Sequence, residues 1–311
     1  MNEIHVVHKR IGGVGHIAKL LEQQGHVVVL PDAKKVAAFA KDKNVGRIFF
    51  HQPLSHLYCL VIVLFNPRLR LKMSCVLHES SHYNIGAAKY FRARLAYLVR
   101  LVVIRMSSLI GVEILGVSEY VCASYFLKNK KTIHFLNLFR EDLERASTEV
   151  TLKEDLAVVW LRKGTAAQTA FCLTNLKLSG CLSGVVLLGD ADEVATVTKR
   201  ILTDRKLQGV PILNDRPSLK QEEFYTYLCR ARWFLSFFAR EGFGLSAFQA
   251  TFFGCIVLAA WSGAIVEWLP VENKKFLDLL ASGTLTPDNA EVSRVSAINM
   301  KFAREHFYNE N

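Results

Sequence analysis

The chain alternates between short apolar runs and longer segments whose apolar residues recur every three or four positions. Ile4–Val7 is a β-branched run, His16–Gln24 has helical spacing, and Val27–Leu30 is again continuously apolar. Runs of four or five apolar residues are typical of buried strands, and the intervening period is that of an amphipathic helix. A strand, a helix and a second strand in this order predict a parallel sheet.

The same rhythm continues to residue 136 and then restarts after a charged stretch at residues 140–149, which we interpret as an interdomain region. Further strands are predicted at 47–50, 74–77, 114–117 and 132–136, then at 156–160, 184–188, 210–213, 233–236 and 255–259. Helices are predicted at 54–65, 87–107 and 118–127, then at 169–178, 194–202, 221–230 and 245–253. Two successive α/β halves with a cleft between them are the architecture that this pattern implies.

The charge balance points to an anionic partner. The chain has 39 Lys and Arg against 28 Asp and Glu. A basic surface suits nucleic acid, a phosphorylated small molecule or lipid headgroups. The positive mean hydropathy of +0.19 favours a membrane-proximal protein over one that binds nucleic acid.

Cysteine usage and the N-terminal residues favour a cytoplasmic location. The seven cysteines are widely spaced and form no Cys-x-x-Cys pair, which predicts buried thiols in a reducing compartment. The first residues lack the succession of a signal peptide. No transmembrane helix is expected, because residues 57–65 are too few and charged residues interrupt residues 95–117.

The clearest candidate for chemistry follows the predicted strand at 233–236, where Glu241-Gly-Phe-Gly-Leu245 leads into a helix. Glycines at 242 and 244 allow a ligand to approach the backbone closely, and they leave amides free at the helix start. Glu241 can accept hydrogen bonds from sugar hydroxyls, and Gln249 is expected to project from the second helical turn toward the same ligand. The structural alternative is an ordinary capped helix with a favourable first-turn charge.

The first half carries a second glycine-rich segment. Gly13–Ala18 fits the pattern G-x-G-x-x-A, with Asp32 at about the distance of a ribose-binding acid, so a nicotinamide or flavin enzyme is one interpretation. We expect a tight turn at Gly12–Gly15, either facing a phosphate or simply joining a strand to a helix.

Several motifs together resemble glycosyltransferase family four, a family of retaining enzymes with the two-Rossmann-domain GT-B fold. The matching segments are Gly12–Gly15, Val76–His78, Val117–Tyr120, Thr132–Asn137, Glu241–Leu245, Ala250–Cys255 and Ser262–Glu267. The resemblance implies domains at residues 1–140 and 141–294, with a helix at about 295–311 crossing back to the first. It also implies transfer of a sugar from a UDP- or GDP-linked donor to a glycan or lipid-linked acceptor, in bacterial surface polysaccharide assembly, without cofactor or metal.

Carried over residue by residue, the resemblance assigns the following roles. Glu241 and His78 contact the transferred sugar, and Phe243, Gly244 and Leu245 offer backbone amides beside it. Gly13 lies near the diphosphate, and Arg162 with Lys163 neutralises it. Gln249 replaces the glutamate that holds the ribose. Gly12 and, from its place at a strand end, His51 lie on the acceptor side.

Two departures from the family pattern matter. Gln249 lacks the charge of the usual glutamate, although an amide still hydrogen-bonds a hydroxyl. Arg162 and Lys163 are contiguous, whereas a short loop usually separates them. A non-catalytic relative that binds glycan or membrane therefore stands as an alternative to the enzyme.

A basic cluster on the predicted helix at 87–107 is a candidate contact with anionic lipid. Its members are Lys89, Arg92, Arg94 and Arg100. Long basic side chains reach toward headgroups from such helices, while a solvated or ion-paired face is the alternative.

Overall fold

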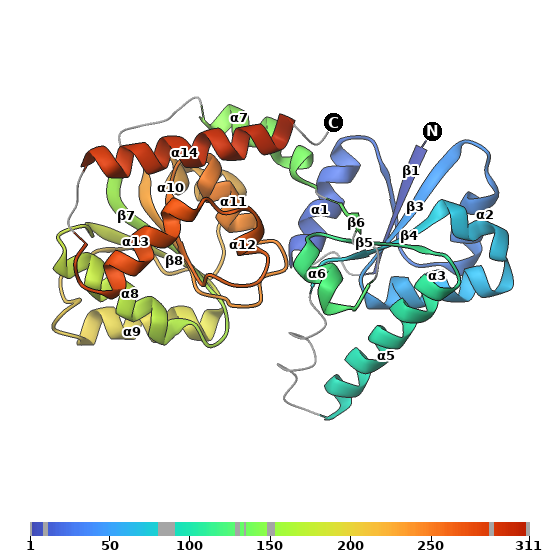
Figure 1. The fold of residues 1–311 in the computed structure, drawn as a ribbon, viewed down its shortest axis with the longest axis horizontal. Helices are drawn as coiled ribbons and strands as arrows, with labels where there is room; N and C mark the ends of the chain where they lie inside the picture. The colour runs from blue at the N-terminus through green and yellow to red at the C-terminus, as the bar shows by residue number, and fades with distance from the viewer. Residues whose placement is uncertain are drawn as a thin grey trace. The chain divides into compact units, whose positions relative to one another are not determined.

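The computed structural model describes residues 2–8, 12–79, 91–127, 131–133, 135–147, 153–285 and 289–308; for some helix residues in these ranges, Arg92 and His16 among them, only the backbone is described. The chain divides into two compact units. Unit 1 comprises residues 1–139 and 240–243, and unit 2 comprises residues 140–239 and 244–311. Figure 1 shows that each unit has its own sheet covered by helices.

Unit 1 contains a parallel six-stranded sheet in the order β2-β1-β3-β4-β5-β6. Its strands are β1 (Asn2–Val7), β2 (Val27–Val29), β3 (Val45–His51), β4 (Met73–Leu77), β5 (Glu113–Gly116) and β6 (Lys131–Thr132). Its helices are α1 (Gly12–Gln23), α2 (Ala33–Lys41), α3 (Pro53–Phe65), α5 (Phe91–Leu109) and α6 (Glu119–Ser124), with 3₁₀ turns at Pro67–Lys72 and Leu136–Phe139. Val6, Ile48 and Val76 from three neighbouring strands are fully buried at its core.

Unit 2 contains a parallel five-stranded sheet in the order β11-β10-β7-β8-β9. Its strands are β7 (Glu154–Leu161), β8 (Gly184–Gly189), β9 (Ile212–Asn214), β10 (Ala231–Ser236) and β11 (Ile256–Ala259). Its helices are α7 (Arg140–Ser147), α8 (Ala166–Leu178), α9 (Ala191–Thr203), α10 (Gln221–Arg230), α11 (Leu245–Phe252), α12 (Ile265–Trp268), α13 (Val271–Ala281) and α14 (Asn289–Tyr308). The all-apolar strand centres explain why these strands are so visible in the sequence, since parallel strands are buried on both faces.

Each sheet has one point where the chain reverses its direction of strand addition. In unit 1 this point lies between β1 and β3, and in unit 2 it lies between β7 and β10. The loops at the carboxyl ends of the two strands leave such a point toward opposite faces, which opens a crevice where ligands of parallel α/β sheets bind. The residues near these two positions are His5 and His51 in unit 1, and residues 162–165 and 237–244 on the loops after β7 and β10.

The predicted α/β fold with two parallel sheets is confirmed, but several local predictions are wrong. Gly12–Gly15 is not a tight turn, because α1 already begins at Gly12. The strand expected at 132–136 is reduced to Lys131–Thr132 and is followed by a 3₁₀ turn. Helices α2, α7, α12 and α13 were not predicted; α7 lies in the charged stretch that we interpreted as an interdomain region.

Helix α14 groups with unit 2, whereas we expected residues 295–311 to cross back to the first half. Asn299 explains the docking of this helix. Its Nδ2 donates to the Cys255 carbonyl at 2.7 Å and to Asn273 Oδ1 at 3.0 Å, in a buried network on β11 and α13. A buried amide whose hydrogen bonds are made in this way fixes the helix in one register.

All seven cysteines are buried thiols without a disulfide, as the sequence predicts. Among the residues that the structure describes, no helix combines the length and the apolar character needed to cross a bilayer.

Candidate functional site

The turn between β10 and α11 has the geometry that the sequence predicts. Gly244 is the N-cap of α11 with φ +85° and ψ 45°, a left-handed conformation that favours glycine. Its carbonyl accepts the first helical hydrogen bond, from Phe248 N at 2.9 Å. The backbone amides that open an α-helix have no partner within the helix, so Leu245 and Ser246 present them at the carboxyl end of β10.

Residues 240–243, just before this turn, group with unit 1. The Ser118 hydroxyl donates to the Gly242 carbonyl at 2.6 Å. A methyl group on Gly242 would lie 2.4 Å from the His78 carbonyl oxygen, so this approach requires glycine. Phe243 packs against the unit 1 core. The structure therefore brings the segment of Glu241 together with His78, two of the predicted site positions.

The Gln249 side chain contacts α10. Its side chain is only 6% exposed, and its Nε2 donates to the Tyr225 hydroxyl at 3.1 Å. Gln221 Nε2 donates to the same oxygen at 2.6 Å. The Gln249 amide thus uses one N–H in a contact with α10, and its role toward a ligand stays a prediction. Gln221 and Tyr225 were not singled out from the sequence, although their spacing of four on one helix could have paired them.

The exposed pair Arg162 and Lys163 lies on a short loop after β7. Thr165 closes this loop, since its Oγ1 accepts from Arg162 N at 3.1 Å and donates to the Arg162 carbonyl at 2.7 Å. The Arg162 guanidinium lies 5.9 Å from the centre of the Phe238 ring. The loop after β7 and the loop after β10 are therefore neighbours in unit 2, as the sheet order requires.

Glu193, on α9, contacts this loop, and the sequence analysis did not predict that contact. Its carboxylate accepts hydrogen bonds from Gly164 N and Ala166 N, both at 2.7 Å. A carboxylate at a helix start satisfies the free amides and is stabilised by the helix dipole. The start of α8 is consequently occupied by a protein anion, so the cations offered to a ligand at this loop are the Arg162 and Lys163 side chains.

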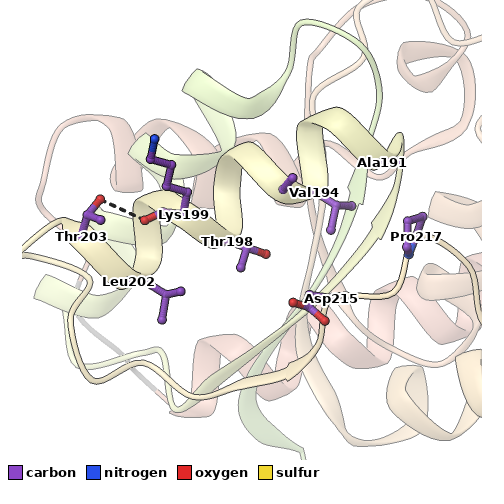
Figure 2. A pocket seen from close by; sticks show the side chains of 9 residues that line it. Ala191, Val194, Thr198, Lys199, Leu202, Thr203, Asp215 and Pro217 are labelled. Carbon is purple, nitrogen blue, oxygen red and sulfur yellow. Dashed lines mark hydrogen bonds between the residues drawn. The ribbon is translucent and has the colours of Figure 1, made fainter.

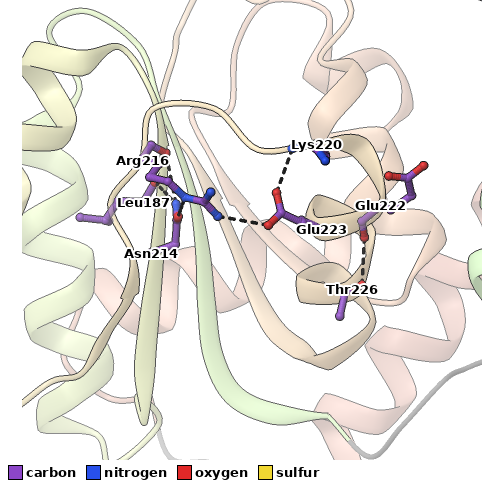
Figure 3. A network of polar contacts seen from close by, with 7 residues as sticks. All are labelled: Leu187, Asn214, Arg216, Lys220, Glu222, Glu223 and Thr226. Carbon is purple, nitrogen blue, oxygen red and sulfur yellow. Dashed lines mark hydrogen bonds and ion pairs between the residues drawn. The ribbon is translucent and has the colours of Figure 1, made fainter.

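The loop after β9 is fixed by a polar network, shown in Figure 3. Asn214 Nδ2 donates to the Leu187 carbonyl on β8 and to the Arg216 carbonyl, both at 3.1 Å. Arg216 donates to Asn214 Oδ1 at 3.0 Å and to Glu223 at 3.2 Å. Every contact is internal, so this network holds the strand ends of unit 2 in place.

In unit 1, three histidine rings form a row at the carboxyl ends of the central strands. His5 Nδ1 lies 3.0 Å from His51 Nε2, and His51 Nδ1 lies 2.9 Å from His78 Nε2. His51 was predicted as an acceptor-side residue and His78 as a sugar contact; the structure places both in this row. His5 was not predicted as a site residue, because a histidine inside an apolar strand gives no signal of its own.

The row is neutral at physiological pH. Burial lowers the pKa of His5 to about 4, with a smaller effect from nearby His26. Burial, followed by the charge of Arg100, lowers the pKa of His78 to about 3. The pKa of His51 is lowered well below its usual value by burial and by both neighbouring histidines. Neutral imidazoles donate with one nitrogen and accept with the other, as this row requires.

Arg100 was predicted to contact lipid as part of the basic cluster, and the structure shows that this prediction is wrong. It is 6% exposed, it lies 3.7 Å from the Glu79 carboxylate, and its guanidinium lies over the Tyr125 ring. A buried, paired arginine cannot reach lipid headgroups. Of the other members, Arg94 is exposed, the side chain of Arg92 is not described, and Lys89 lies outside the described residues.

Asp32, the candidate ribose-binding acid, has a structural role. Its carboxylate accepts from Lys34 N at 2.9 Å and from Lys35 N at 3.2 Å, as the N-cap of α2. Because the Asp32 carboxylate caps a helix, the dinucleotide-binding interpretation loses its ribose-binding acid.

A hollow of about 390 Å³ lies beside α9 in unit 2, as Figure 2 shows. It is lined mainly by apolar and hydroxyl side chains, among them Val194, Thr198 and Leu202, with Asp215 and Pro217. None of the predicted site residues lines it, so it does not define the candidate site.

The two parallel sheets, their strand orders and the loops at their reversal points define the GT-B fold, and solved structures support this. The HepE protein of Anabaena, solved with UDP and glucose, superposes with a TM-score of 0.67 at 14% identity, covering 99% of this chain and 95% of its own. Sucrose-phosphate synthase of Thermosynechococcus elongatus gives 0.63 at 13% identity, covering 99% and 95%. A putative UDP-N-acetylglucosamine 2-epimerase of Listeria monocytogenes gives 0.55 at 9% identity, covering 100% and 97%. No protein-family model and no curated protein sequence matches the chain.

Proposed function

We propose that the protein is a glycosyltransferase that moves a sugar from a UDP- or GDP-linked donor to a glycan or lipid-linked acceptor, with retained configuration. The turn at Gly244 carries this proposal, because its left-handed glycine presents helix amides directly after Glu241. Structurally similar proteins were solved with UDP and with UDP-glucose, which supports a sugar nucleotide as ligand. A role in bacterial surface polysaccharide assembly follows from the same resemblance.

The chemistry requires charge stabilisation more than a reactive side chain. Departure of a nucleoside diphosphate builds negative charge on its phosphates, and fixed cations and amides that meet this charge lower the barrier. We assign this role to Arg162 and Lys163 with the amides of Gly244 and Leu245. No metal or cofactor is required for this step.

The sugar itself needs hydrogen-bonding partners. We assign these contacts to Glu241, whose carboxylate accepts from hydroxyls, and to His78. Because His78 Nε2 is bonded to His51, its Nδ1 is the nitrogen left for a ligand. We keep Gly13 near the diphosphate and Gly12 on the acceptor side. His51 is fully buried with both ring nitrogens bonded to His5 and His78, so it orients His78 and does not touch the acceptor, although the sequence had suggested that contact.

Binding and turnover test this proposal separately. Calorimetric titration with UDP, GDP and NAD should show affinity for one of the two nucleoside diphosphates; affinity for NAD alone contradicts the proposal. Glu241→Ala should then lower donor turnover by a factor of at least 10 while the protein remains folded. Glu222→Ala, an exposed acid on α10, is the matched control and should leave turnover unchanged.

Product analysis separates a transferase from an epimerase, the printed description of one structurally similar protein, and from a non-catalytic relative. An epimerase would return the donor sugar as its epimer without an acceptor, and a non-catalytic relative would bind UDP or GDP without any turnover. Transfer of label from the donor to an added glycan or lipid acceptor is the expected result.

We further propose that unit 1 contacts an anionic membrane through one face of α3 and α5, which pack beside each other (Figure 1). Apolar side chains on this face are exposed at helical spacing. They are Leu54, Leu57, Val61 and Leu64 on α3, and Leu95, Leu98, Val102 and Met106 on α5. Exposed apolar side chains gathered on two adjacent helices mark a membrane or partner contact in soluble proteins. The exposed Arg94 and Arg105 on α5 add positive charge that suits anionic headgroups.

Flotation with phosphatidylcholine vesicles, with and without phosphatidylglycerol, tests this contact. Binding should require the anionic lipid, and the double change Leu98→Glu and Val102→Glu should abolish it. Leu178→Glu, at a more exposed position on α8 of unit 2, should bind like the wild type. Unchanged binding of the double variant contradicts the assigned face.

A further inference from the structure

Three potential metal ligands gather at one edge of the unit 1 sheet. Glu3 and His5 are alternate residues of β1, so their side chains leave the same face of the sheet. His26 directly precedes β2, which pairs with β1. One ligand atom from each of the three residues lies within 4.8 Å of the other two.

His5 provides a ligand atom that needs a partner. Its side chain is 1% exposed, and its Nε2 is buried without a hydrogen-bond partner among the described residues. Its other ring nitrogen is already bonded to His51. A buried nitrogen without a partner is energetically costly, and such atoms commonly bind an ion or an ordered water.

We propose that Glu3, His5 and His26 bind a divalent transition-metal ion, with Zn²⁺ the best match. Two imidazoles and one carboxylate, with the fourth position left to water, form a set that zinc accepts in proteins. Magnesium and calcium prefer sites made entirely of oxygen ligands. The ion takes the lone pair of His5 Nε2 and so satisfies the orphaned atom.

Binding requires the three ligand atoms, which lie within 4.8 Å of one another, to move closer together. His26 Nδ1 and Glu3 Oε2 are 3.9 Å apart, and ligand atoms at about 2.0–2.2 Å from a tetrahedral ion are somewhat closer together than this. The side chains of His26 and Glu3 are 31% and 43% exposed, so they are free to close on an ion that enters from solvent. The His26 and His5 rings lie beside each other, with their centres 5.5 Å apart.

The histidine row supplies the outer shell of this site. Metal-bound histidines commonly donate their second ring N–H to a fixed acceptor, which sets the tautomer. With the ion on Nε2, the His5 proton sits on Nδ1 and donates to His51 Nε2. His51 then donates from Nδ1 to His78 Nε2, in agreement with both short distances. A surface ion pair between His26 and Glu3 would explain their own contact, but it leaves His5 Nε2 unexplained.

Metal titration of the full-length protein without a histidine tag tests the proposal. Zn²⁺ titrated in competition with a chromophoric chelator should bind with a stoichiometry of one per chain, and Co²⁺ should give the visible absorption of a four-coordinate site. His26→Ala and Glu3→Gln should each weaken Zn²⁺ binding by a factor of about 10–100 or more. Both residues are partly exposed, so both variants should fold, which circular dichroism checks.

The matched control is His8→Ala, which removes a nearby histidine outside the cluster. It should bind Zn²⁺ like the wild type. The proposal is overturned if the wild type takes up no stoichiometric Zn²⁺, or if the two ligand variants retain its affinity. Mg²⁺ at the same concentrations should not raise the melting temperature, whereas Zn²⁺ should.

Discussion

The amide of Gln249 donates to the hydroxyl of Tyr225 across 3.1 Å, inside unit 2. The Tyr225 hydroxyl also accepts a hydrogen bond from Gln221, so this one hydroxyl joins α10 to α11. Gln249, for which the sequence resemblance implies a ribose contact, is therefore part of a helix-helix contact. This explains how α11, and with it the Gly244 turn, is held against its neighbour.

Removal of this hydroxyl should destabilise the protein. Tyr225→Phe leaves the buried Gln249 amide and the part-buried Gln221 amide without this acceptor, so we expect a loss of about 1–3 kcal/mol in the free energy of unfolding. Urea denaturation measures it as a lower midpoint with an unchanged slope. Tyr227→Phe on the same helix is the control and should change the midpoint little; equal effects of the two variants would refute the assigned role.

Glu193 should have opposite effects on stability and on ligand binding. Glu193→Gln weakens the two hydrogen bonds to the start of α8, at a cost of about 1 kcal/mol. The same change removes a negative charge beside Arg162 and Lys163, so UDP or GDP should bind more tightly if these cations hold the diphosphate. Calorimetry with the nucleotide, set beside urea unfolding, measures both effects. A lower nucleotide affinity in a folded variant would contradict the proposed role of the loop.

Two glycines with positive φ in unit 2 should respond very differently to alanine. Gly189 has φ +114°, and a methyl group there would lie 2.0 Å from the Leu161 carbonyl oxygen. Gly180 has φ +71° with no described atom within 4 Å of such a methyl. Gly180→Ala should cost about 1–2 kcal/mol from backbone strain alone, and Gly189→Ala should exceed 4 kcal/mol or prevent folding. Thermal unfolding of both variants compares them, and similar melting temperatures would refute the clash.

Stability should fall as the pH is lowered below about 6.5. Burial depresses the folded-state pKa of His5 to about 4 and of His78 and His56 to about 3. Between these values and 6.5 the unfolded chain binds protons that the folded chain does not, so each histidine contributes about 1.4 kcal/mol per pH unit. Urea unfolding at pH 7.5, 6.5, 5.5 and 4.5 should show a loss that steepens below 6.5. Stability that is constant over this range would contradict the buried, neutral row.

The seven thiols should be unreactive in the native protein. All are buried, and burial raises the pKa of Cys172 to about 12, which suppresses the reactive thiolate. A chromogenic disulfide reagent should therefore modify seven thiols in denaturant and none rapidly in buffer. A fast-reacting thiol in the folded state would show that one of these positions opens locally.

Much of the fold can be predicted from the sequence because parallel strands are buried on both faces and appear as uninterrupted apolar runs. Helix α10 was predicted at its observed bounds, and α11 was predicted to begin at Leu245, where the structure has it begin. Gly12 shows the limit of such reasoning, since a glycine run at a strand end is compatible with both a turn and a first helical turn.

The site could be predicted only in part, because its geometry depends on residues far apart in the chain. Glu193 caps a loop 29 residues earlier, and His5 meets His51 across 46 residues. No local pattern encodes such pairs. Arg100 fails for the opposite reason: its local pattern fits an exposed basic face, but Glu79 and Tyr125 enclose it.

The proton positions in the row of His5, His51 and His78 are coupled to one another. Three neutral rings joined by two hydrogen bonds can place their protons in only two consistent orders, all pointing one way or all the other. The row therefore behaves as a binary element: whatever fixes the proton at one ring decides whether the ring at the far end offers a donor or an acceptor. A change of protonation or ligand at the sheet edge would in this way convert the free nitrogen of His78 from donor to acceptor, with no backbone atom displaced.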